Sequence, residues 1–233
     1  PGISSAASDV YKRQVLIPSP IGNLLDITKR AIEEIENSDL IFCEDTRHTV
    51  KLLNHLEIKK TLKSYHKFNE HKIVESIINK LKNGCRVGLI SDAGTPGISD
   101  PGYLIVKKCI EHNIKVECLP GPTALIPALV ISGLPCERFS FEGFLPIKKG
   151  RKTRLEELSI EKKTMIFYES PHKLIKTLND FSKAFGSERE ISVTKEISKV
   201  FESTFRGKIV EVIEQINETK IKGEFVIVIA GKK

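Results

Sequence analysis

The sequence predicts an α/β protein with two domains. The first is a mostly parallel five-stranded sheet with helices on both faces, and the second is a mixed-sheet α/β domain. Two observations predict this class. Short apolar runs alternate with helical patterns throughout residues 15–120, an alternation typical of parallel sheets. After Leu134 this rhythm changes, and two of the later apolar runs lie close enough in sequence to pair as antiparallel strands. We place the second domain at residues 121–233.

Five strands are expected in the N-terminal domain, and turn-rich or acidic loops follow four of them. Helices fill the intervals, for example where Ile73, Ile77 and Leu81 recur at helical spacing. Because the carboxyl ends of parallel strands meet at one edge of a sheet, we expect these loops to converge. The expected strands span residues 15–18, 39–43, 62–66, 86–90 and 115–119.

The C-terminal domain begins with an apolar helix that Thr123 is placed to cap. Later helices are expected to end near Phe185 and to begin near Ile209. Residues 1–14 lack any periodicity and contain no methionine. We interpret them as a disordered tail or an artefact of sequence assembly, and we exclude them from both domains. The expected strands of this domain span residues 139–145, 164–168, 190–196, 202–206 and 224–229.

The composition of the 233 residues, with 40% hydrophobic and 29% charged residues, is typical of a soluble globular protein. A net charge of +7 favours an anionic partner such as nucleic acid, and a merely Lys-rich surface is the alternative. Five cysteines without any CxxC pair favour reduced thiols in the cytosol over disulfides or a zinc site. No apolar run reaches the roughly 18 residues that span a bilayer. We therefore expect a cytoplasmic protein that binds neither membrane nor metal.

One loop, residues 88–102, organises the N-terminal domain. It follows a buried strand and is rich in glycine, which lets a ligand approach the backbone. Asp92 and Asp100 can accept hydrogen bonds from hydroxyl or amino groups, and the loop contains no Lys or Arg. A phosphate site would use cationic residues. We expect a ligand site here, with a helix that starts at Pro101 and is capped by Asp100. A long connecting turn is the alternative.

Two adjacent carboxylates, Glu44 and Asp45, follow the second strand. Two adjacent carboxylates lower the stability of the fold unless they are solvated or form ion pairs with cations. Arg47 can either pair with one of them or hold a substrate phosphate. The alternative is an N-capping cluster with Asp45 or Thr46 as the cap. His66 follows the neighbouring strand and can reach the same edge. Glu44, Asp45 and His66 are thus candidate general bases, and the sequence singles out none of them.

A basic run lies at the start of a helix in the C-terminal domain. The helix dipole disfavours cations at that end, so we expect the run to have another purpose and propose that it contacts RNA phosphates. A flexible charged surface loop is the alternative. The cations are Lys148, Lys149, Arg151, Lys152 and Arg154.

Five motifs occur in order: PIGNLxD from Pro20, CEDTRxT from Cys43, SDAGTPxISDPG from Ser91, PGPTA from Pro120 and ESPH from Glu169. Together they resemble the ribosomal RNA small subunit methyltransferase I family, within the tetrapyrrole-methylase-like class of S-adenosylmethionine enzymes. The resemblance covers residues 15–231, nearly the whole chain. Each motif is weakly specific by itself, whereas five in order are highly specific.

The resemblance implies two α/β domains with S-adenosylmethionine in the cleft between them, and a homodimer. It implies methyl transfer to the ribose 2′-hydroxyl of a cytidine in the decoding region of 16S rRNA, with the rRNA or the small ribosomal subunit as partner. Two alternatives stay open. One is a corrin or porphyrin carbon methyltransferase of the same fold, and the other is a non-catalytic RNA-binding module with a degenerate cofactor pocket.

The resemblance also implies which residues contact the cofactor, while Glu44, Asp45, Arg47 and His66 are the candidate catalytic residues. Residues 120–123 are alternatively only a turn and cap, and Glu224 only a charge at a strand edge. The implied cofactor residues are Pro20, Ile21, Gly22, Asn23, Asp92, Ala93, Gly94, Thr95, Pro96, Ile98, Ser99, Asp100, Gly121, Pro122, Thr123, Ala124, Tyr168, Glu169, Ser170, Glu224, Phe225 and Val226.

Overall fold

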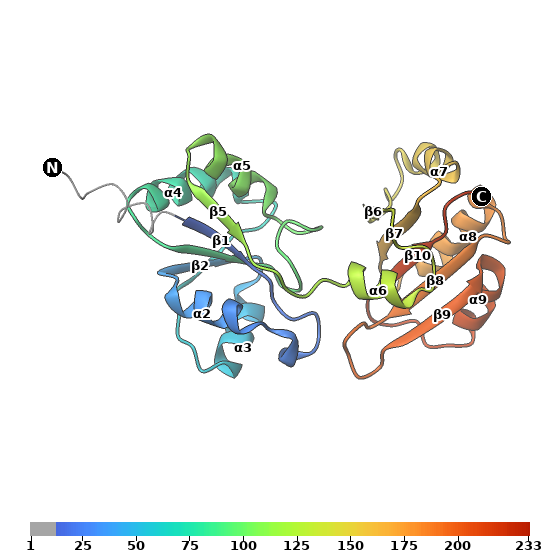
Figure 1. Cartoon of the computed structure of the whole chain (residues 1–233), viewed down its shortest axis with the longest axis horizontal. Coiled ribbons are helices and arrows are strands. Elements are labelled where there is room, and N and C mark those ends of the chain that lie inside the picture. Colours follow the sequence, from blue (N-terminus) through green and yellow to red (C-terminus); the bar gives the residue numbers. More distant parts are fainter. Residues whose placement is uncertain (1–12) are drawn as a thin grey trace. The chain divides into compact units, whose positions relative to one another are not determined.

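The structure, a computed structural model, describes residues 13–233. The chain divides into two compact units between Thr123 and Ala124 (Figure 1). Most of the expected N-terminal tail, residues 1–12, lies outside the described residues. Arg13 and Gln14 do not belong to a tail, which corrects the expectation: they begin strand β1 (Arg13–Ile17). The Arg13 guanidinium donates to Glu117 Oε2 at 2.8 Å, so long-range pairing recruits a polar residue that apolar patterning excludes from the strand.

The first unit contains one sheet in the order β3-β2-β4-β1-β5, and every neighbouring pair is parallel. This confirms the expected parallel five-stranded sheet. Because its central strands are buried on both faces, they read as continuous apolar runs. The further strands are β2 (Leu40–Cys43), β3 (Leu62–Ser64), β4 (Val87–Ile90) and β5 (Lys115–Cys118).

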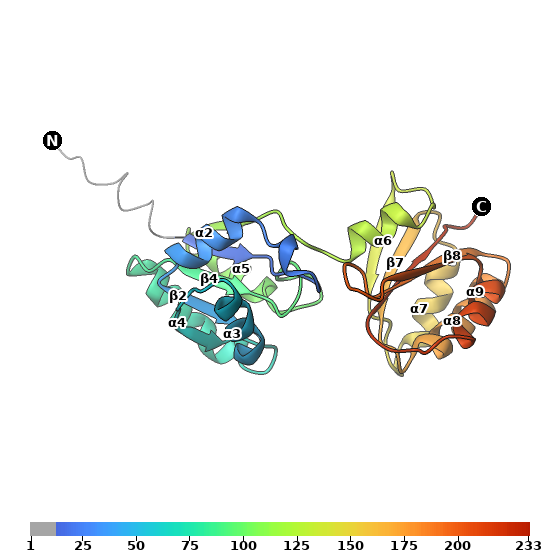
Figure 2. The same cartoon turned by 90° about the horizontal axis from the view of Figure 1, so that it is seen from below.

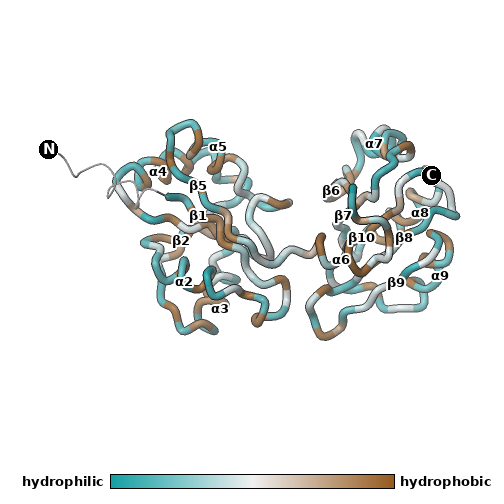
Figure 3. The backbone as a smooth tube through the Cα atoms, viewed as in Figure 1, coloured by the Kyte–Doolittle hydropathy of each residue, from teal (hydrophilic) through white to brown (hydrophobic). Residues whose placement is uncertain are grey.

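Helices cover both faces of this sheet (Figure 1). On one face lie α2 (Lys29–Asn37) and α3 (Thr46–His55), preceded by the short helix η1 (Leu24–Asp26). On the other lie α4 (Glu70–Lys82) and α5 (Tyr103–Glu111). Each face has its own apolar core, and the apolar stretches of the strands run between them (Figure 3).

Helix α5 starts later than the sequence predicted. Gly102, not Asp100, is its N-terminal cap. A Cβ placed on Gly102 would lie 2.9 Å from the backbone nitrogen of Gly97, closer than real side chains approach. The backbone at Gly102 therefore packs directly against the backbone of Gly97, which a residue with a side chain would prevent. This contact lies within the loop, and α5 begins only after it, at Tyr103. A local capping pattern does not reveal such a contact.

The second unit contains a mixed sheet in the order β6-β7-β10-β8-β9. β6 and β7 are parallel, and the remaining pairs are antiparallel, which confirms the expected change of topology. The antiparallel ladder of β8 and β9 is the pair predicted from their proximity in sequence. The strands are β6 (Phe139–Gly143), β7 (Thr164–Glu169), β8 (Glu190–Lys195), β9 (Ser203–Lys208) and β10 (Phe225–Ile229).

Three helices, α7 (Arg151–Ser159), α8 (Leu174–Phe185) and α9 (Ile209–Asn217), pack on one face of this sheet over an apolar core. Helix α6 (Leu125–Ile131) lies on the opposite side, against β7 and β10 (Figure 2). Thr123 does not cap α6, contrary to expectation. Its cap is Ala124, which makes no side-chain capping bond.

Arg151, expected among the RNA contacts, is buried at the start of α7. Its Nε donates to Asp180 Oδ2 at 2.8 Å, its Nη2 donates to Thr177 Oγ1 at 2.8 Å and its Nη1 donates to the Pro146 carbonyl at 3.1 Å. All three groups are thus engaged within the unit, and Arg151 is not available to a phosphate. It fastens α7 to α8 and to the loop before it.

Replacing Arg151 by Ala is therefore expected to lower the free energy of unfolding by about 3 kcal/mol, because Asp180 and Thr177 lose a buried partner. Lys152→Ala, one residue further along the exposed side of the helix, is the matched control and should change stability by less than about 0.5 kcal/mol. Chemical denaturation measures both values. Equal stabilities of the two variants would contradict the structural role of Arg151.

Candidate functional site

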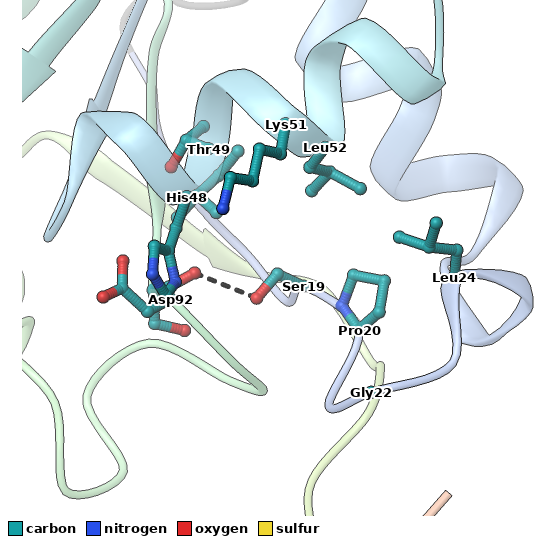
Figure 4. Close-up of a pocket in the computed structure, with 11 residues that line it drawn as sticks. Ser19, Pro20, Gly22, Leu24, His48, Thr49, Lys51, Leu52 and Asp92 are labelled. Atoms are coloured by element: carbon teal, nitrogen blue, oxygen red, sulfur yellow. Dashed lines mark hydrogen bonds between the residues drawn. The ribbon is translucent and has the colours of Figure 1, made fainter. Parts of the chain in front are cut away.

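Two loops at the carboxyl edge of the first sheet are joined directly by their backbones. Strands β1 and β4 are parallel neighbours, so the loops that follow them start side by side. The Ser19 N–H donates to the Gly94 carbonyl at 2.9 Å, and the Gly94 N–H donates back at 3.0 Å. The Ser19 hydroxyl also donates to the Ser91 carbonyl at 2.9 Å (Figure 4). The PIGN segment is thereby held against the long loop of residues 88–102.

A third loop, residues 120–123, joins the same edge. The Thr95 hydroxyl donates to the Pro122 carbonyl at 3.1 Å. Gly94 has a φ of +80°, and a Cβ placed on it would lie 3.4 Å from Ile21 Cγ2 and 3.5 Å from the Pro122 oxygen. Gly94 is thus the point at which all three loops meet, and its backbone conformation is one that side-chain-bearing residues rarely adopt. The predicted convergence of the loops is confirmed.

A cavity of about 270 Å³ lies beside these loops (Figure 4). Several of its lining residues were not singled out in the sequence, although the signal was present. Helix α3 begins just after Asp45 at the sheet edge, so its first turns had to face the loops. The lining residues are Ser19, Pro20, Gly22, Leu24, His48, Thr49, Lys51, Leu52, Ile90, Ser91 and Asp92. Of these, Pro20, Gly22 and Asp92 were predicted as site residues, and the sequence analysis did not assign the other eight to the site.

Asp45 is the N-terminal cap of α3, which was the alternative kept open for this motif. Its Oδ1 accepts the Arg47 N–H at 2.9 Å, and its Oδ2 accepts from the Arg47 guanidinium at 2.5 Å. The side-chain hydrogen bond from Arg47 holds the pKa of Asp45 well below its usual range. The two residues therefore neutralise each other, which leaves Asp45 a poor proton acceptor. The Asp45 backbone N–H donates to Asp92 Oδ1 at 3.0 Å and so ties α3 to the long loop.

Glu44 differs from its neighbour in acid strength. Burial, followed by the negative charge of Asp92, raises the pKa of Glu44 above its usual value, while Lys67 and His66 act in the opposite direction. Glu44 therefore lies close enough to all three to feel their charge. A carboxylate whose pKa is raised is a better proton acceptor. Among the candidate bases, Glu44 is the one whose environment suits that function.

His66 follows strand β3 and belongs to a local turn. Its backbone N–H donates to Asn69 Oδ1 at 2.8 Å, and its Nδ1 accepts the Phe68 N–H at 3.3 Å. His66 influences Glu44 as a nearby charge. Neither His66 nor Glu44 is among the residues that line the cavity.

In the second unit, the two predicted cofactor segments are neighbouring strand ends. Tyr168 pairs with Val226, and Glu169 pairs with Phe225, in the ladder of β7 and β10. However, the Phe225 side chain lies in the apolar core. The buried Glu169 carboxylate accepts the Ser170 N–H at 2.7 Å and the Thr177 hydroxyl at 2.6 Å. These two side chains face inward, so any ligand contact at these positions comes from the backbone.

The remaining charged residues that were predicted to belong to the site also differ in their surroundings. Glu224 lies just before β10 and pairs with Lys199 at 2.8 Å, with its side chain 75% exposed. Arg154 is bound by Glu142 and, at 2.9 Å, by Glu157, so it is not free for RNA. Lys152 lies 3.8 Å from Glu156 on the exposed side of α7.

Among the residues that the structure describes, no group of His, Cys, Asp and Glu could hold a metal ion. The same residues, 13–233, contain no helix long and apolar enough to cross a membrane.

The fold of this chain is similar to that of the uroporphyrin-III C-methyl transferase of Thermus thermophilus. The solved complex of that enzyme with S-adenosylhomocysteine matches with a TM-score of 0.64 at 15% identity, over 94% of this chain and 97% of that one. A likeness at this identity shows the fold. The sequence profile of the tetrapyrrole (corrin/porphyrin) methylases matches residues 15–213. The chain therefore belongs to the tetrapyrrole methylase family.

Within this family, the chain is similar to curated proteins called ribosomal RNA small subunit methyltransferase I. It is 48% identical over 183 residues to the protein of Vibrio cholerae, which covers 78% of this chain and 64% of that protein. It is 44% identical over 183 residues to the protein of Thermotoga maritima, covering 78% and 82%. The chain thus spans somewhat less than two thirds of the length of the Vibrio relative. These matches confirm the resemblance found in the five motifs.

The acid strength of Glu44 gives a test of the site's electrostatics. Because its folded pKa is raised, the native state binds more protons than the unfolded chain between the two pKa values, so stability falls as pH rises through that interval. Asp92→Asn keeps a hydrogen-bond acceptor for Asp45 but removes the charge, and should lower the pKa of Glu44. Lys67→Met removes a cation and should raise it.

Carboxyl ¹³C NMR titration of the parent and the two variants measures these shifts. The variants serve as controls for each other because the expected shifts have opposite signs. Shifts of the same sign, or none, would show that Glu44 does not sense these neighbours.

Proposed function

We propose that the protein is an S-adenosylmethionine-dependent methyltransferase that methylates the ribose 2′-hydroxyl of a cytidine in the decoding region of 16S rRNA. The observation that carries this proposal is the convergence of three loops at one edge of the sheet, where the long loop contains Asp92 and Asp100 but no Lys or Arg. The identity to proteins named as methyltransferases of the small-subunit rRNA supplies the substrate class. The chemistry of the site and the distribution of surface cations support the two halves of the proposal separately.

The polar groups of the long loop fit this cofactor. S-Adenosylmethionine supplies a methyl group bound to a positively charged sulfur, together with hydroxyl and amino groups, and it has no phosphate. The long loop offers the carboxylates of Asp92 and Asp100 and contains no Lys or Arg. The left-handed Gly94, whose N–H and carbonyl are both paired with Ser19, holds this loop against Ile21 and Pro122. We infer that residues 20–23, 92–96, 98–100 and 121–123 of the first unit would hold it.

In the second unit, Ala124 and the backbones of residues 168–170 and 224–226 are the proposed cofactor contacts. The inward side chains of Glu169 and Phe225 keep these strand ends in place rather than contact the ligand. The solved Thermus relative is a complex with S-adenosylhomocysteine, which supports the class of cofactor. The expected cleft for the cofactor stays a prediction.

Glu44 follows β2 at the same edge of the sheet, although it is not among the residues that line the cavity, and its environment suits transfer to a hydroxyl group. Glu44 would accept the proton of the substrate hydroxyl, because its pKa is raised by burial and by Asp92. Arg47 restrains Asp45 through its hydrogen bonds and so leaves Glu44 as the proton acceptor. Holding the substrate in line contributes on the order of 7–11 kcal/mol, whereas a general base contributes about 10²–10⁴-fold. Positioning by the loops is therefore the larger effect.

The partner would be 16S rRNA or the small ribosomal subunit, and such a substrate would place the protein in the cytoplasm. Of the basic run, Lys148, Lys149 and Lys152 remain for phosphate contacts, since Arg151 and Arg154 are engaged within the unit. The homodimer implied by the resemblance is also part of this proposal. A corrin or porphyrin methyltransferase is the second candidate, because the same family profile covers those enzymes.

Gly94→Val should abolish S-adenosylmethionine binding, because a β-branched residue cannot adopt a φ of +80° without displacing the loop. Gly186→Val is the matched control: its φ is +92°, and nothing lies within 4 Å of its would-be Cβ, in a turn after α8. Isothermal titration calorimetry measures both, with circular dichroism to check folding. A Gly94→Val variant that binds the cofactor like the parent would place the cofactor elsewhere.

Methyl transfer itself is measured with tritiated S-adenosylmethionine, offered with small ribosomal subunits, protein-free 16S rRNA or a precorrin. We expect label in the rRNA. Glu44→Gln should lower kcat by about 10²–10⁴-fold with unchanged cofactor affinity, as the loss of a general base predicts. Label in the precorrin alone would favour the second candidate. Cofactor binding without transfer to any acceptor would argue for a non-catalytic module.

A further inference from the structure

Three aromatic rings meet at one edge of the second sheet. Phe141 of β6 and Tyr168 of β7 have ring centroids 4.9 Å apart at an interplanar angle of 67°. Phe144, in the loop after β6, lies 5.8 Å from Tyr168 at 65°. Such edge-to-face contacts fix the orientation of each ring. The cluster belongs to the face of the sheet opposite the main core, because Met165 and Phe167, which alternate with Tyr168 along β7, point into that core.

Phe144 is 58% exposed despite these contacts. Its neighbours in the chain hold it in this position. Leu145 is buried in the core of the unit, and the Pro146 carbonyl accepts a hydrogen bond from the buried Arg151. The loop is thus anchored immediately after Phe144, and the ring is presented to solvent by a fixed backbone. An aromatic ring held outward in this way loses little conformational freedom when it binds a ligand.

Two lysines without ion-pair partners in the described part of the chain follow the ring shortly afterwards in the sequence. Lys148 and Lys149 are exposed, and neither has an ion-pair partner among residues 13–233. The nearest acid in the chain, Glu142, is already bound by Arg154. An exposed aromatic face next to free cations is the combination with which proteins bind single-stranded nucleic acid, where bases stack on rings and cations follow the backbone.

We propose that Phe144, supported by Tyr168 and Phe141, is a stacking platform for an unpaired base of the RNA substrate, with Lys148 and Lys149 on the adjacent phosphates. The choice of RNA as the occupant rests on the proposed function and on charge. A two-fold contact between copies centred on Phe144 would bring the same lysines together, which like-charge repulsion opposes. The platform would select unpaired segments of the substrate, because a base inside a duplex has no face to offer.

The sequence offers a direct probe, because the chain contains no tryptophan. Phe144→Trp would place a single indole at the platform, and its fluorescence should be quenched when a short single-stranded RNA is added. Quenching should be weaker with a duplex of the same sequence. Phe201→Trp is the matched control. Phe201 is 77% exposed and lies between β8 and β9, at the opposite edge of the sheet, so its emission should not respond.

Phe144→Ala should weaken binding of this RNA, measured by fluorescence anisotropy in the absence of cofactor, by about 5- to 150-fold, the range observed for removing one stacking partner. Its salt dependence should match that of the parent, because no phosphate contact is lost. Lys148→Ala with Lys149→Ala should instead reduce the slope of log affinity against log salt by about 0.7 per lost contact. Phe201→Ala should bind as the parent does.

Several results would overturn the platform. One is parental RNA affinity in Phe144→Ala, and another is an indole at position 144 that does not respond to RNA. A third is Phe144→Ala turning a dimer into a monomer in light scattering while RNA affinity is kept, which would make the cluster an interface between copies. The proposed function fails separately: a parent that binds RNA through Phe144 but transfers no methyl group would refute the enzyme and leave the platform intact.

Discussion

The reciprocal hydrogen bonds between Ser19 and Gly94 are the constraint on which the candidate site depends. They can form only because β1 and β4 are parallel neighbours, which starts both following loops at the same edge. With β5 on the other side of β1, the loop at residues 120–123 is brought to Gly94 as well. The order of the strands in the sheet therefore brings the three loops together. The contacts between them are largely made by backbone groups, whose positions do not depend on any single side chain.

Three acidic residues at this edge of the sheet have different environments. Asp45 is held ionised by Arg47, Asp92 accepts the Asp45 N–H, and Glu44 is pushed toward its neutral form by burial and by Asp92. Adjacent carboxylates with separated pKa values are a recurrent arrangement for acid–base chemistry. The neighbouring residues Glu44 and Asp45 thus differ in function: Asp45 caps the start of α3, and Glu44 is the residue that we propose as the proton acceptor.

In the basic run of the second unit, too, neighbouring residues have different structural environments. Arg151 turns inward and joins α7 to α8 through Asp180 and Thr177, while Lys148 and Lys149, shortly after Phe144 in the chain, remain exposed to solvent. The buried arginine fixes the loop that presents the exposed groups. Thr177 also donates to the buried Glu169, so a single polar network supports both the aromatic edge and the end of β7.

The sequence by itself determined the fold class, the order of the strands along the chain and the edge at which the loops converge. These follow from periodicity and from the rule that parallel strands end on the same side, both of which are local or topological. Only the tertiary structure decided which way individual side chains point. Arg151, Glu169 and Phe225 face inward, and His48 and Lys51 line the cavity. The physical reason is that burial and pairing depend on partners far away in the chain, such as Asp180 for Arg151, and a pattern of neighbouring residues carries no record of them.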